Sequence, residues 1–407
     1  MLAVLQPLGA PPFIVQCSIQ FQTVFPTVAR HPHKKDFTLR GLAKTVSRLT
    51  AARRLMHLSI SDATPSRLIE LRGFGTNPGN LLAKAFVPSS LPDGAPLVVV
   101  LHGCTQTSSG YDSGSGWSQL AEREGFALLY PEQQGGNNSN LCFNWYSPED
   151  ACRGRGEAKS ISQMVVHMTS AYRLDPKRVF VTGLSAGGAM TSVMLATYPE
   201  LFAGGAIIAG IPFASANTLP EALARMRGQG SPGRSQLAAR ARASLNDFGP
   251  LPTLSVWHGT HDTIVDSQNA DWIVEQWRDV HGLGAATGTV ERVGQHRREV
   301  WRDGHGREVI ERYDIRGMGH GTPLATGTGA GCGVAGPHML EANICSTRRI
   351  ASFWGLVVAS APSQARLGTI QQPAARHKGR PNPGIIKPAS TVGSIIEDAL
   401  RSAGLMR

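Results

Sequence analysis

Hydrophobic runs of strand length alternate with helical patterns through the middle of the chain, between residues 66 and 356. Apolar segments predict strands at 95–103, 126–131, 178–183, 203–210 and 252–259, and the continuous apolar run at 95–103 is typical of a strand buried on both faces. Between them, apolar residues at helical spacing predict helices over 116–125, 157–174, 186–199, 267–282 and 347–356. Alternating strands and helices predict an α/β fold. Its sheet is expected to be mostly parallel, flanked by helices on both faces, with ligands at the carboxyl ends of the strands.

Less regular segments complete this plan. Residues 67–75 and 81–91, separated by the turn-rich "TNPGN", predict two hairpin-like strands, and a last strand is expected within 308–321. Residues 132–156 form a long polar loop with embedded aromatic residues, and a loop of that length inside a compact domain is usually functional. We expect residues 214–250 to form a mobile insert.

Charge divides the chain into a folded body and two extensions. The formal net charge is +11, of which residues 1–55 carry +7 and residues 366–407 carry +5, leaving −1 for the remainder. A protein that binds nucleic acid would spread basic residues over its folded body, so we expect solvated extensions and no nucleic-acid partner. The domains are then a largely disordered N-terminal extension over 1–65, a folded domain over 66–360, and a Pro-rich basic linker over 361–390.

Residues 391–407 predict a short amphipathic helix at the C-terminus. Ser394 and Glu397 form a capping box, and Ile395, Ile396 and Leu400 lie on one apolar stripe. So short a helix is marginally stable alone in water, so we expect its stripe to be buried against the folded domain or against an outside partner.

Composition indicates neither a membrane protein nor a metal or nucleotide site. Hydrophobic residues make up 41% of the chain without a run long enough to span a bilayer, and the N-terminus shows no evident signal peptide. The six cysteines include no CxxC pair, and the irregular spacing of Cys332, His338 and Cys345 argues against a metal site. "GCGVAG" at 331–336 formally matches a dinucleotide fingerprint, but no strand precedes it. We expect no cofactor and no metal. We expect residues 331–336 to form a mobile loop beside His320.

The segment "VFVTGLSAGGAM" carries the strongest chemical signal. Its G-x-S-x-G motif follows a predicted strand and precedes a predicted helix, the context in which a nucleophilic serine stands on a sharp turn. The sequence therefore predicts Ser185 as a nucleophile.

A nucleophilic serine needs a histidine base and an acid that orients it, which follow the serine in this architecture in the order acid, then histidine. Asp262 follows the predicted strand 252–259, and His320 follows the last strand. Asp266 is a rival acid that better suits a helix cap. His102, His258 and His338 are weaker candidates for the base, the first two because they precede glycines in tight turns and His338 because it lies deep in a Gly-rich loop.

An ester-cleaving serine also needs N–H donors for the oxyanion that develops on the substrate carbonyl. The backbone N–H of Ala186 follows the nucleophile at a helix N-terminus. The second donor should come from the loop after an early strand, "LHGCTQ", where the N–H of Cys104 fits.

Four segments together make the sequence familiar: "PLVVVLHGCTQTSSGYDSGSGW", "YPEQQGGNNSNLCFNWYSPEDACRGRGE", "DPKRVFVTGLSAGGAMTSVMLATYPELFAGGA" and "HGTHDTIV". They resemble the poly(3-hydroxybutyrate) depolymerase family of α/β-hydrolase esterases, over about residues 66–356. The resemblance implies an α/β-hydrolase fold and a serine esterase with a Ser185, His320 and Asp262 triad. Its oxyanion loop falls on His102-Gly103-Cys104.

The resemblance also implies features around the site. The aromatic loop of the family corresponds to "CFNWY", which makes Asn144 and Trp145 candidates for binding the acyl chain; the alternative for Trp145 is a core residue. Secreted family members often join the cysteines of these two loops, here Cys104 and Cys142, although Cys152 is an equally near partner. Location outside the cell is implied in the same way, with the cytoplasm as the alternative.

Three functions stay open. The first is hydrolysis of short-acyl esters, such as hydroxyalkanoate oligomers or polyhydroxybutyrate-type polyesters. The second is a feruloyl or acetylxylan-type carbohydrate esterase, which shares fold and triad. The third, from another class, is a catalytically silent granule-binding protein, and a granule is also the outside partner that residues 391–407 could bind. The stretch after 361 is too short for the separate substrate-binding module that degraders of crystalline polymer carry, which favours oligomers.

Overall fold

The computed structural model describes residues 66–245, 249–284, 286–327 and 332–357, and from Leu68 onward these belong to one compact unit. The predicted extension over 1–65, linker over 361–390 and helix over 391–407 lie outside the described residues.

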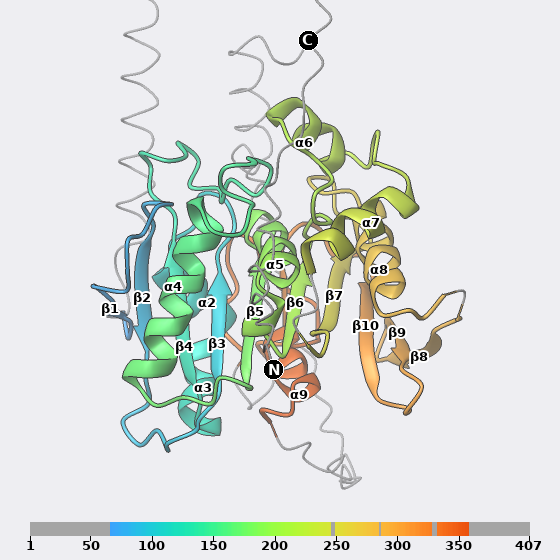
Figure 1. Cartoon of the computed structure of the whole chain (residues 1–407). Helices are drawn as coiled ribbons and strands as arrows, with labels where there is room; N and C mark the ends of the chain where they lie inside the picture. Colours follow the sequence, from blue (N-terminus) through green and yellow to red (C-terminus); the bar gives the residue numbers. More distant parts are fainter. Residues whose placement is uncertain (1–65, 246–248, 285, 328–331, 358–407) are drawn as a thin grey trace, which may run out of the picture. The chain divides into compact units, whose positions relative to one another are not determined.

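A mixed sheet forms the centre of the described chain, with helices around it (Figure 1). Ten described strands lie in the order β1 (Ile69–Glu70), β2 (Leu82–Phe86), β4 (Ala127–Glu132), β3 (Leu97–Leu101), β5 (Val179–Leu184), β6 (Gly204–Ile208), β7 (Thr253–Gly259), β10 (Glu308–Ile315), β9 (His296–Arg302) and β8 (Thr289–Val293). The six strands from β4 to β10 in this order are parallel, and the strands on either side of them pair antiparallel. The mostly parallel α/β sheet predicted from the sequence is therefore confirmed.

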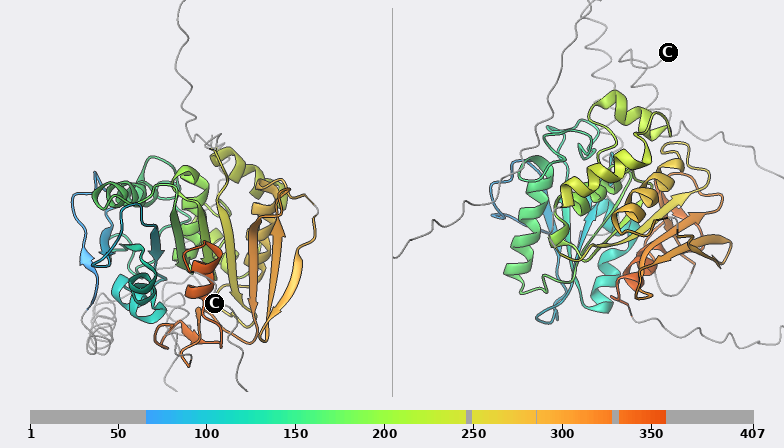
Figure 2. Two further views of the ribbon diagram at one scale, coloured as in Figure 1. Left: turned by 90° about the horizontal axis from the view of Figure 1, so that it is seen from below. Right: turned by 45° about the vertical axis from the view of Figure 1, so that its right-hand side comes forward.

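Helices cover both faces of the sheet, which Figure 2 shows on its left side. One face packs against α4 (Gly156–Ala171), α5 (Ala186–Thr197), α6 (Leu219–Met226), α7 (Arg234–Leu245) and α8 (Gln268–Val280), and the other against α2 (Ser108–Ser115), α3 (Trp117–Glu124) and α9 (Ser346–Phe353). In β3, Leu97, Val99 and Leu101 belong to the first core, while Val98 and Val100 belong to the second. Both faces of the strand are buried, and this explains why its sequence is apolar at every position.

The structure corrects one expectation and adds elements that the sequence did not predict. The segment 214–250, expected as a mobile insert, contains α6 and α7, and Leu237, Ala238 and Ala241 of α7 are buried. Helix α2 and the β8–β9 hairpin were not predicted at all. The hairpin adds two antiparallel strands beyond β10.

A small second sheet lies after the last long strand. It pairs β11 (Thr322–Leu324) with β12 (Met339–Glu341) in parallel, and the disulfide between Cys332 and Cys345 encloses the segment that contains β12. A short 3₁₀ turn, η1 (Pro199–Leu201), follows α5.

The parallel strands direct their carboxyl ends to one edge of the sheet. The segments that leave this edge after β3, β5, β7 and β10 contain Cys104, Ser185, Asp262 and His320. Any chemistry of these residues is thereby gathered at one edge.

Candidate active site

Ser185 stands on a sharp turn between β5 and α5. Its backbone has φ 57° and ψ −116°, a left-handed region that costs a non-glycine residue about 1–3 kcal/mol. The turn is held because the N–H of Ser185 donates to the Ile208 carbonyl at 2.9 Å. The strained serine is the geometry expected of a nucleophile at the end of a parallel strand.

The flanking glycines are required by close approach of backbone. A Cβ on Gly187 would lie 2.3 Å from the Leu101 carbonyl oxygen, and one on Gly183 would lie 2.4 Å from the Gly187 carbonyl. Both distances are shorter than any real carbon contact, so no side chain fits at either position. The two glycines thus allow the start of α5 to pack directly against the ends of β3 and β5.

Asp262 and His320 meet as the sequence predicted. His320 Nδ1 donates to Asp262 Oδ2 at 2.7 Å, and the Asp262 side chain is fully buried. Because a carboxylate only accepts, His320 carries its proton on Nδ1 and leaves Nε2 as the basic nitrogen. Asp266, the rival acid, instead accepts from the N–H of Gln268, the first residue of α8, at 2.8 Å.

Four donors surround the Asp262 carboxylate. The N–H groups of Ile264 and Val265 donate to Oδ1, both at 2.9 Å, and His258 Nε2 lies 3.4 Å from Oδ2 beside the His320 bond. Burial alone would raise the pKa of Asp262, but the hydrogen bonds of His258 and His320 hold that pKa well below its ordinary value. Asp262 is therefore a fixed anion, ready to stabilise an imidazolium at His320.

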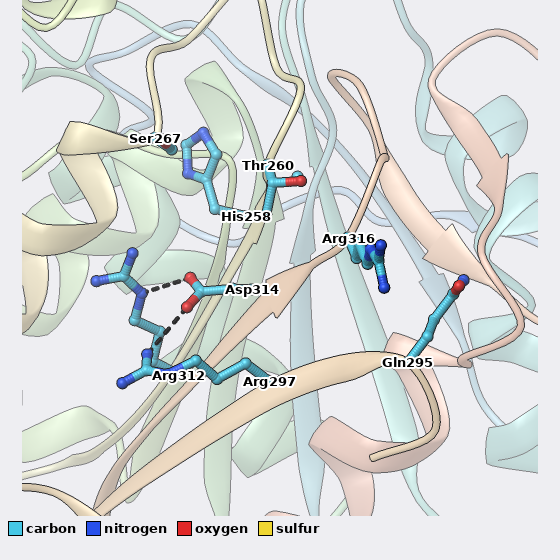
Figure 3. Close-up of a pocket in the computed structure, with 9 residues that line it drawn as sticks. His258, Thr260, Ser267, Gln295, Arg297, Arg312, Asp314 and Arg316 are labelled. Carbon is cyan, nitrogen blue, oxygen red and sulfur yellow. Dashed lines mark hydrogen bonds and ion pairs between the residues drawn. The ribbon is translucent and has the colours of Figure 1, made fainter. Parts of the chain in front are cut away.

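His258 was one of the weaker candidates for the base, and the structure gives it another position. It is 2% exposed, and Nε2 also contacts the Val265 carbonyl at 2.8 Å. Its ring borders a cavity of about 400 Å³, in which Arg297 and Arg312 converge on Asp314 (Figure 3). Because a carbonyl only accepts, His258 Nε2 carries a proton that it donates to Val265, so this nitrogen is not available as a base.

The Ser185 hydroxyl makes no hydrogen bond to His320 within the described ranges. Asp262 and His320 are therefore hydrogen-bonded to each other. Ser185 lies at the same edge of the sheet but is not hydrogen-bonded to His320. Catalytic hydrogen bonds are often long in the absence of substrate.

The loop after β3 orients the Gly103–Cys104 peptide. His102 Nε2 accepts from the N–H of Gln133 at 3.1 Å, so its Nδ1 carries the proton and donates to the Gly103 carbonyl at 2.8 Å. Since the carbonyl and the next N–H point in opposite directions across a trans peptide, this bond fixes the direction of the Cys104 N–H. Ala186 is the first residue of α5, so its N–H has no acceptor inside that helix.

A disulfide joins this loop to the aromatic loop. The bond links Cys104 and Cys142, the pairing that the resemblance implied, and Cys152 lies outside both disulfides. The bond holds the proposed oxyanion donor of Cys104 next to the segment that contains Asn144 and Trp145.

Asn144 and Trp145 lie deeper than expected of residues that bind an acyl chain. Trp145 is 8% exposed and packs edge-on against Tyr146, with ring centroids 5.6 Å apart. The Asn144 N–H donates to Glu157 Oε2 at 2.9 Å, and its side-chain amide donates to Oε1 at 2.8 Å. Only an edge of the indole is left for a substrate.

Glu157 is a buried carboxyl that the sequence reasoning missed. It is 1% exposed and also accepts from Gln133 Nε2 at 2.5 Å, so it connects the aromatic loop with the strand end that supports His102. Burial, and after it the charge of Asp150, raises the pKa of Glu157 to about 8. One signal was available, an acidic residue in the first turn of a helix after a long polar loop, but it equally fits an exposed helix start.

His338 lies beside the proposed base, in the segment that was expected to form a loop near His320. Its Nδ1 contacts the His320 carbonyl oxygen at 3.1 Å, and the two rings meet edge to face with centroids 5.7 Å apart. The irregular spacing of Cys332, His338 and Cys345 argued against a metal site, and in the structure the two cysteines form a disulfide with each other. No cluster of three potential metal ligands occurs among the residues that the structure describes.

Comparison with known proteins shows which family the chain resembles. The sequence profile described as "Esterase PHB depolymerase" matches residues 82–302, a region that includes Ser185 and Asp262 and ends before His320. The chain is 46% identical to "Poly(3-hydroxyalkanoate) depolymerase C" of Paucimonas lemoignei over 306 residues, which cover 74% of this chain and 73% of that protein.

Carbohydrate esterases are also similar. An "Acetylxylan esterase" of Coprinopsis cinerea is 33% identical over 264 residues, covering 63% of this chain and 70% of that protein. The solved structure of "Acetyl xylan esterase from Aspergillus awamori" matches with a TM-score of 0.60 and 26% identity, covering 71% of this chain and 99% of that one.

In the described ranges, every helix is too short or too polar to cross a bilayer.

Proposed function

The chain belongs to the esterase PHB depolymerase family and is a carboxylic ester hydrolase of the serine type, and from this premise we propose that it cleaves short-acyl esters through Ser185, His320 and Asp262. The proposed substrates are hydroxyalkanoate oligomers or polyhydroxybutyrate-type polyesters. The observation that carries the proposal is the buried Asp262–His320 pair at the sheet edge where the strained Ser185 stands.

The proposed reaction has two halves. His320 Nε2 takes the Ser185 proton as Oγ attacks the ester carbonyl, and the oxyanion accepts from the N–H groups of Ala186 and Cys104. The tetrahedral intermediate then collapses, and His320 returns the proton to the leaving alkoxide, which departs as the alcohol. Water attacks the acyl-enzyme in the same manner, giving the free acid and restoring Ser185.

Asp262 supports both halves without changing its protonation. Its carboxylate holds the His320 Nδ1–H and stabilises the imidazolium that forms when Nε2 takes a proton. The four donors around Asp262 keep it charged, so the proton stays on the histidine.

The acyl side of the site is proposed to be bordered by the aromatic loop. Its disulfide to Cys104 sets the distance between the oxyanion donors and the exposed edge of Trp145. Asn144 contributes by holding this loop through Glu157.

Acetylxylan hydrolysis is the second candidate function. It is supported by the acetylxylan esterases of known sequence and structure that resemble this chain, whereas the depolymerase of Paucimonas lemoignei is more similar, at 46% identity. A catalytically silent granule-binding protein would have no need for the strained serine or the fixed acid–base pair.

We also propose that the protein works outside the cell. Two disulfides lie around the site, and such bonds persist in oxidising surroundings.

The test begins with p-nitrophenyl butyrate. Ser185→Ala is expected to lower kcat at least a thousandfold with unchanged Tm, and Ser235→Ala, an exposed serine of α7, is the matched control. A Ser185→Ala variant that keeps most of the wild-type rate contradicts the nucleophile assignment.

Substrate class is decided by a panel. Hydroxybutyrate oligomers, acetylated xylan and feruloyl esters are compared by kcat/KM under one condition. The proposal expects the oligomers to rank first, and acetylated xylan in first place would establish the alternative.

A further inference from the structure

His338 occupies a backbone conformation that a histidine rarely adopts. Gly336 and Met339 exchange two backbone hydrogen bonds of 3.0 Å, which closes a tight turn with Pro337 and His338 at its centre. His338 has φ +58°, where glycine or asparagine is normally found. The turn would form more easily with either residue, so the imidazole needs another explanation.

Two hydrogen bonds of His338 hold the segment that contains the proposed base. Its Nδ1 lies 3.1 Å from the His320 carbonyl oxygen, and its own carbonyl accepts from the N–H of Thr322 at 2.8 Å. A carbonyl only accepts, so Nδ1 of His338 must carry a proton. The backbone on both sides of Gly321 is therefore tied to a single residue.

The ring of His338 also contacts the ring of His320 directly. The two planes are at 80° with centroids 5.7 Å apart, an edge-to-face arrangement. Burial lowers the pKa of His338, which keeps this ring neutral beside the imidazolium that the proposed mechanism forms at His320. A neutral neighbour packs against His320 without repelling its charge.

The turn itself has a firm support. The Cys332–Cys345 disulfide encloses it, and the N–H of Val334 donates to the Gly114 carbonyl at 3.0 Å. Met339, the next residue after His338, is buried in the core. A side chain placed on such a turn can restrict the motion of its neighbour.

We propose that His338 is a positioning residue that holds the His320 backbone and imidazole in the orientation where Nδ1 faces Asp262 and Nε2 stays available to Ser185. The inference rests on the proposed function, since it takes His320 as the base. His338 touches no reacting atom in this scheme, so its effect passes through His320.

The kinetic test uses His338→Gly. Glycine removes the imidazole and adopts φ +58° without strain, so Tm is expected to stay close to that of the wild type. For p-nitrophenyl butyrate we expect kcat to fall tenfold or more, with KM changed less than twofold. His338→Asn also tolerates the turn and presents an amide donor, and is expected to recover part of the lost kcat.

Asn343→Gly is the matched control. Asn343 is exposed, has φ +56° and lies in the same disulfide-enclosed segment, so this variant reports on loop perturbation alone. It is expected to keep wild-type kcat. An unchanged kcat in His338→Gly overturns the proposal, and so does a loss of kcat that comes with an equal rise in KM and a large fall in Tm.

Proton NMR tests the proposal without any substrate. The His320 Nδ1–H held by Asp262 should give a low-field resonance that Asp262→Asn abolishes. We expect this resonance to broaden or vanish in His338→Gly and to persist in Asn343→Gly and in Ser185→Ala. If it remains sharp in His338→Gly, the proposal is wrong. An active Ser185→Ala would instead remove the proposed function and leave this readout intact.

Discussion

The Asp262 carboxylate is held in one orientation by the hydrogen bonds that it accepts. Its carboxylate is fully buried and accepts from two backbone N–H groups and from His320, with His258 nearby. An amide at this position would offer an N–H to at least one of these donors, and the His320 tautomer would be lost.

We therefore expect Asp262→Asn to lower kcat by a few orders of magnitude in a folded protein. Asp266→Asn is the control: the Asp266 carboxylate bonds to the backbone at the start of α8, so its replacement should change Tm slightly and kcat little. Steady-state kinetics with p-nitrophenyl butyrate and thermal unfolding measure both. The reverse ranking of the two variants would move the acid to Asp266.

Glu157 makes stability depend on pH in an unusual direction. Its carboxyl has the ordinary glutamate pKa of 4.5 in the unfolded chain and a pKa of about 8 in the folded one. Between these values the folded state holds a proton that the unfolded state has lost, so a rising pH favours unfolding. The stabilisation is complete below the unfolded pKa and is lost as pH rises through about 8.

Glu157→Gln should therefore flatten the pH dependence of Tm between about pH 5 and 8, removing a wild-type decline worth on the order of a few kcal/mol. Glu149→Gln, at an exposed position in the same loop, is the control. Parallel decline of Tm in wild type and Glu157→Gln would show that another group is responsible.

At the scale of single residues, the sequence predicted the proposed catalytic set because each member follows a strand in a fixed chain order. Glu157 and Gln133 could not be predicted this way. A buried polar residue reveals itself only through its partners, and these lie on a strand end, a loop and a helix that the fold brings together. The role of His338 was hidden for a related reason, since it contacts a residue 18 positions away in the sequence, which the fold brings beside it.

The aromatic loop is an element whose position depends on the disulfide between Cys104 and Cys142. The bond closes a segment with a sequence separation of 38, which in the chain-entropy picture stabilises the fold by about 4 kcal/mol. For Cys332 and Cys345, with a separation of 13, the same relation gives about 3 kcal/mol.

The variant Cys104→Ala with Cys142→Ala should lose kcat as well as stability, because the bond also holds the proposed oxyanion donor. Cys332→Ala with Cys345→Ala should lose less stability. Denaturant unfolding and kinetics separate the two effects. Full activity after loss of the Cys104–Cys142 bond would show that the loop keeps its place without it.

Trp145 tests whether this element packs or binds. Since the indole is nearly buried, Trp145→Ala is expected to cost about 3–5 kcal/mol of stability. If its exposed edge also binds acyl chains, KM should rise more for long chains than for acetate esters. Tyr146→Ala, which removes the ring packed against Trp145, is the control for loop disorder. An equal KM at all chain lengths would leave Trp145 as a core residue.

The elements that the sequence missed share a physical cause. Arg and Glu make up much of strands β8 and β9, and β8 is almost wholly exposed, so no core-facing stripe marks it. One cue was present, the two-residue turn Gly294-Gln295, in which Gly294 has φ +62°. Helices α6 and α7 are rich in Ala and Arg, and their apolar faces are short.

At the scale of the whole molecule, the proposed chemistry lies within one compact unit. All residues assigned a role fall between His102 and Glu157 or between Ser185 and Cys345. We therefore propose residues 66–360 as the catalytic domain, and expect a protein reduced to them to keep wild-type kcat/KM and Tm. A large loss of Tm would show that the removed segments stabilise the domain.

The role predicted for residues 391–407 concerns a part of the chain outside the described residues. Deleting them separates the two alternatives by thermal unfolding and by sedimentation with polyhydroxybutyrate granules. A lower Tm with unchanged sedimentation indicates docking on the domain, and an unchanged Tm with lost sedimentation indicates a granule tether. If neither changes, the helix hypothesis is wrong.

The glycines around Ser185 also bear on how relatives of this protein can be recognised. Gly183 and Gly187 are excluded from carrying a side chain by backbone atoms of β3 and α5, whatever residue stands at position 185. A descendant that lost its esterase activity could replace Ser185 freely, and would even gain stability by placing glycine there. It could not replace the two glycines without parting the strand from the helix. In newly determined sequences, the two glycines therefore indicate descent from this family. The residue that corresponds to Ser185 then distinguishes relatives that can act as serine hydrolases from those that have lost the activity.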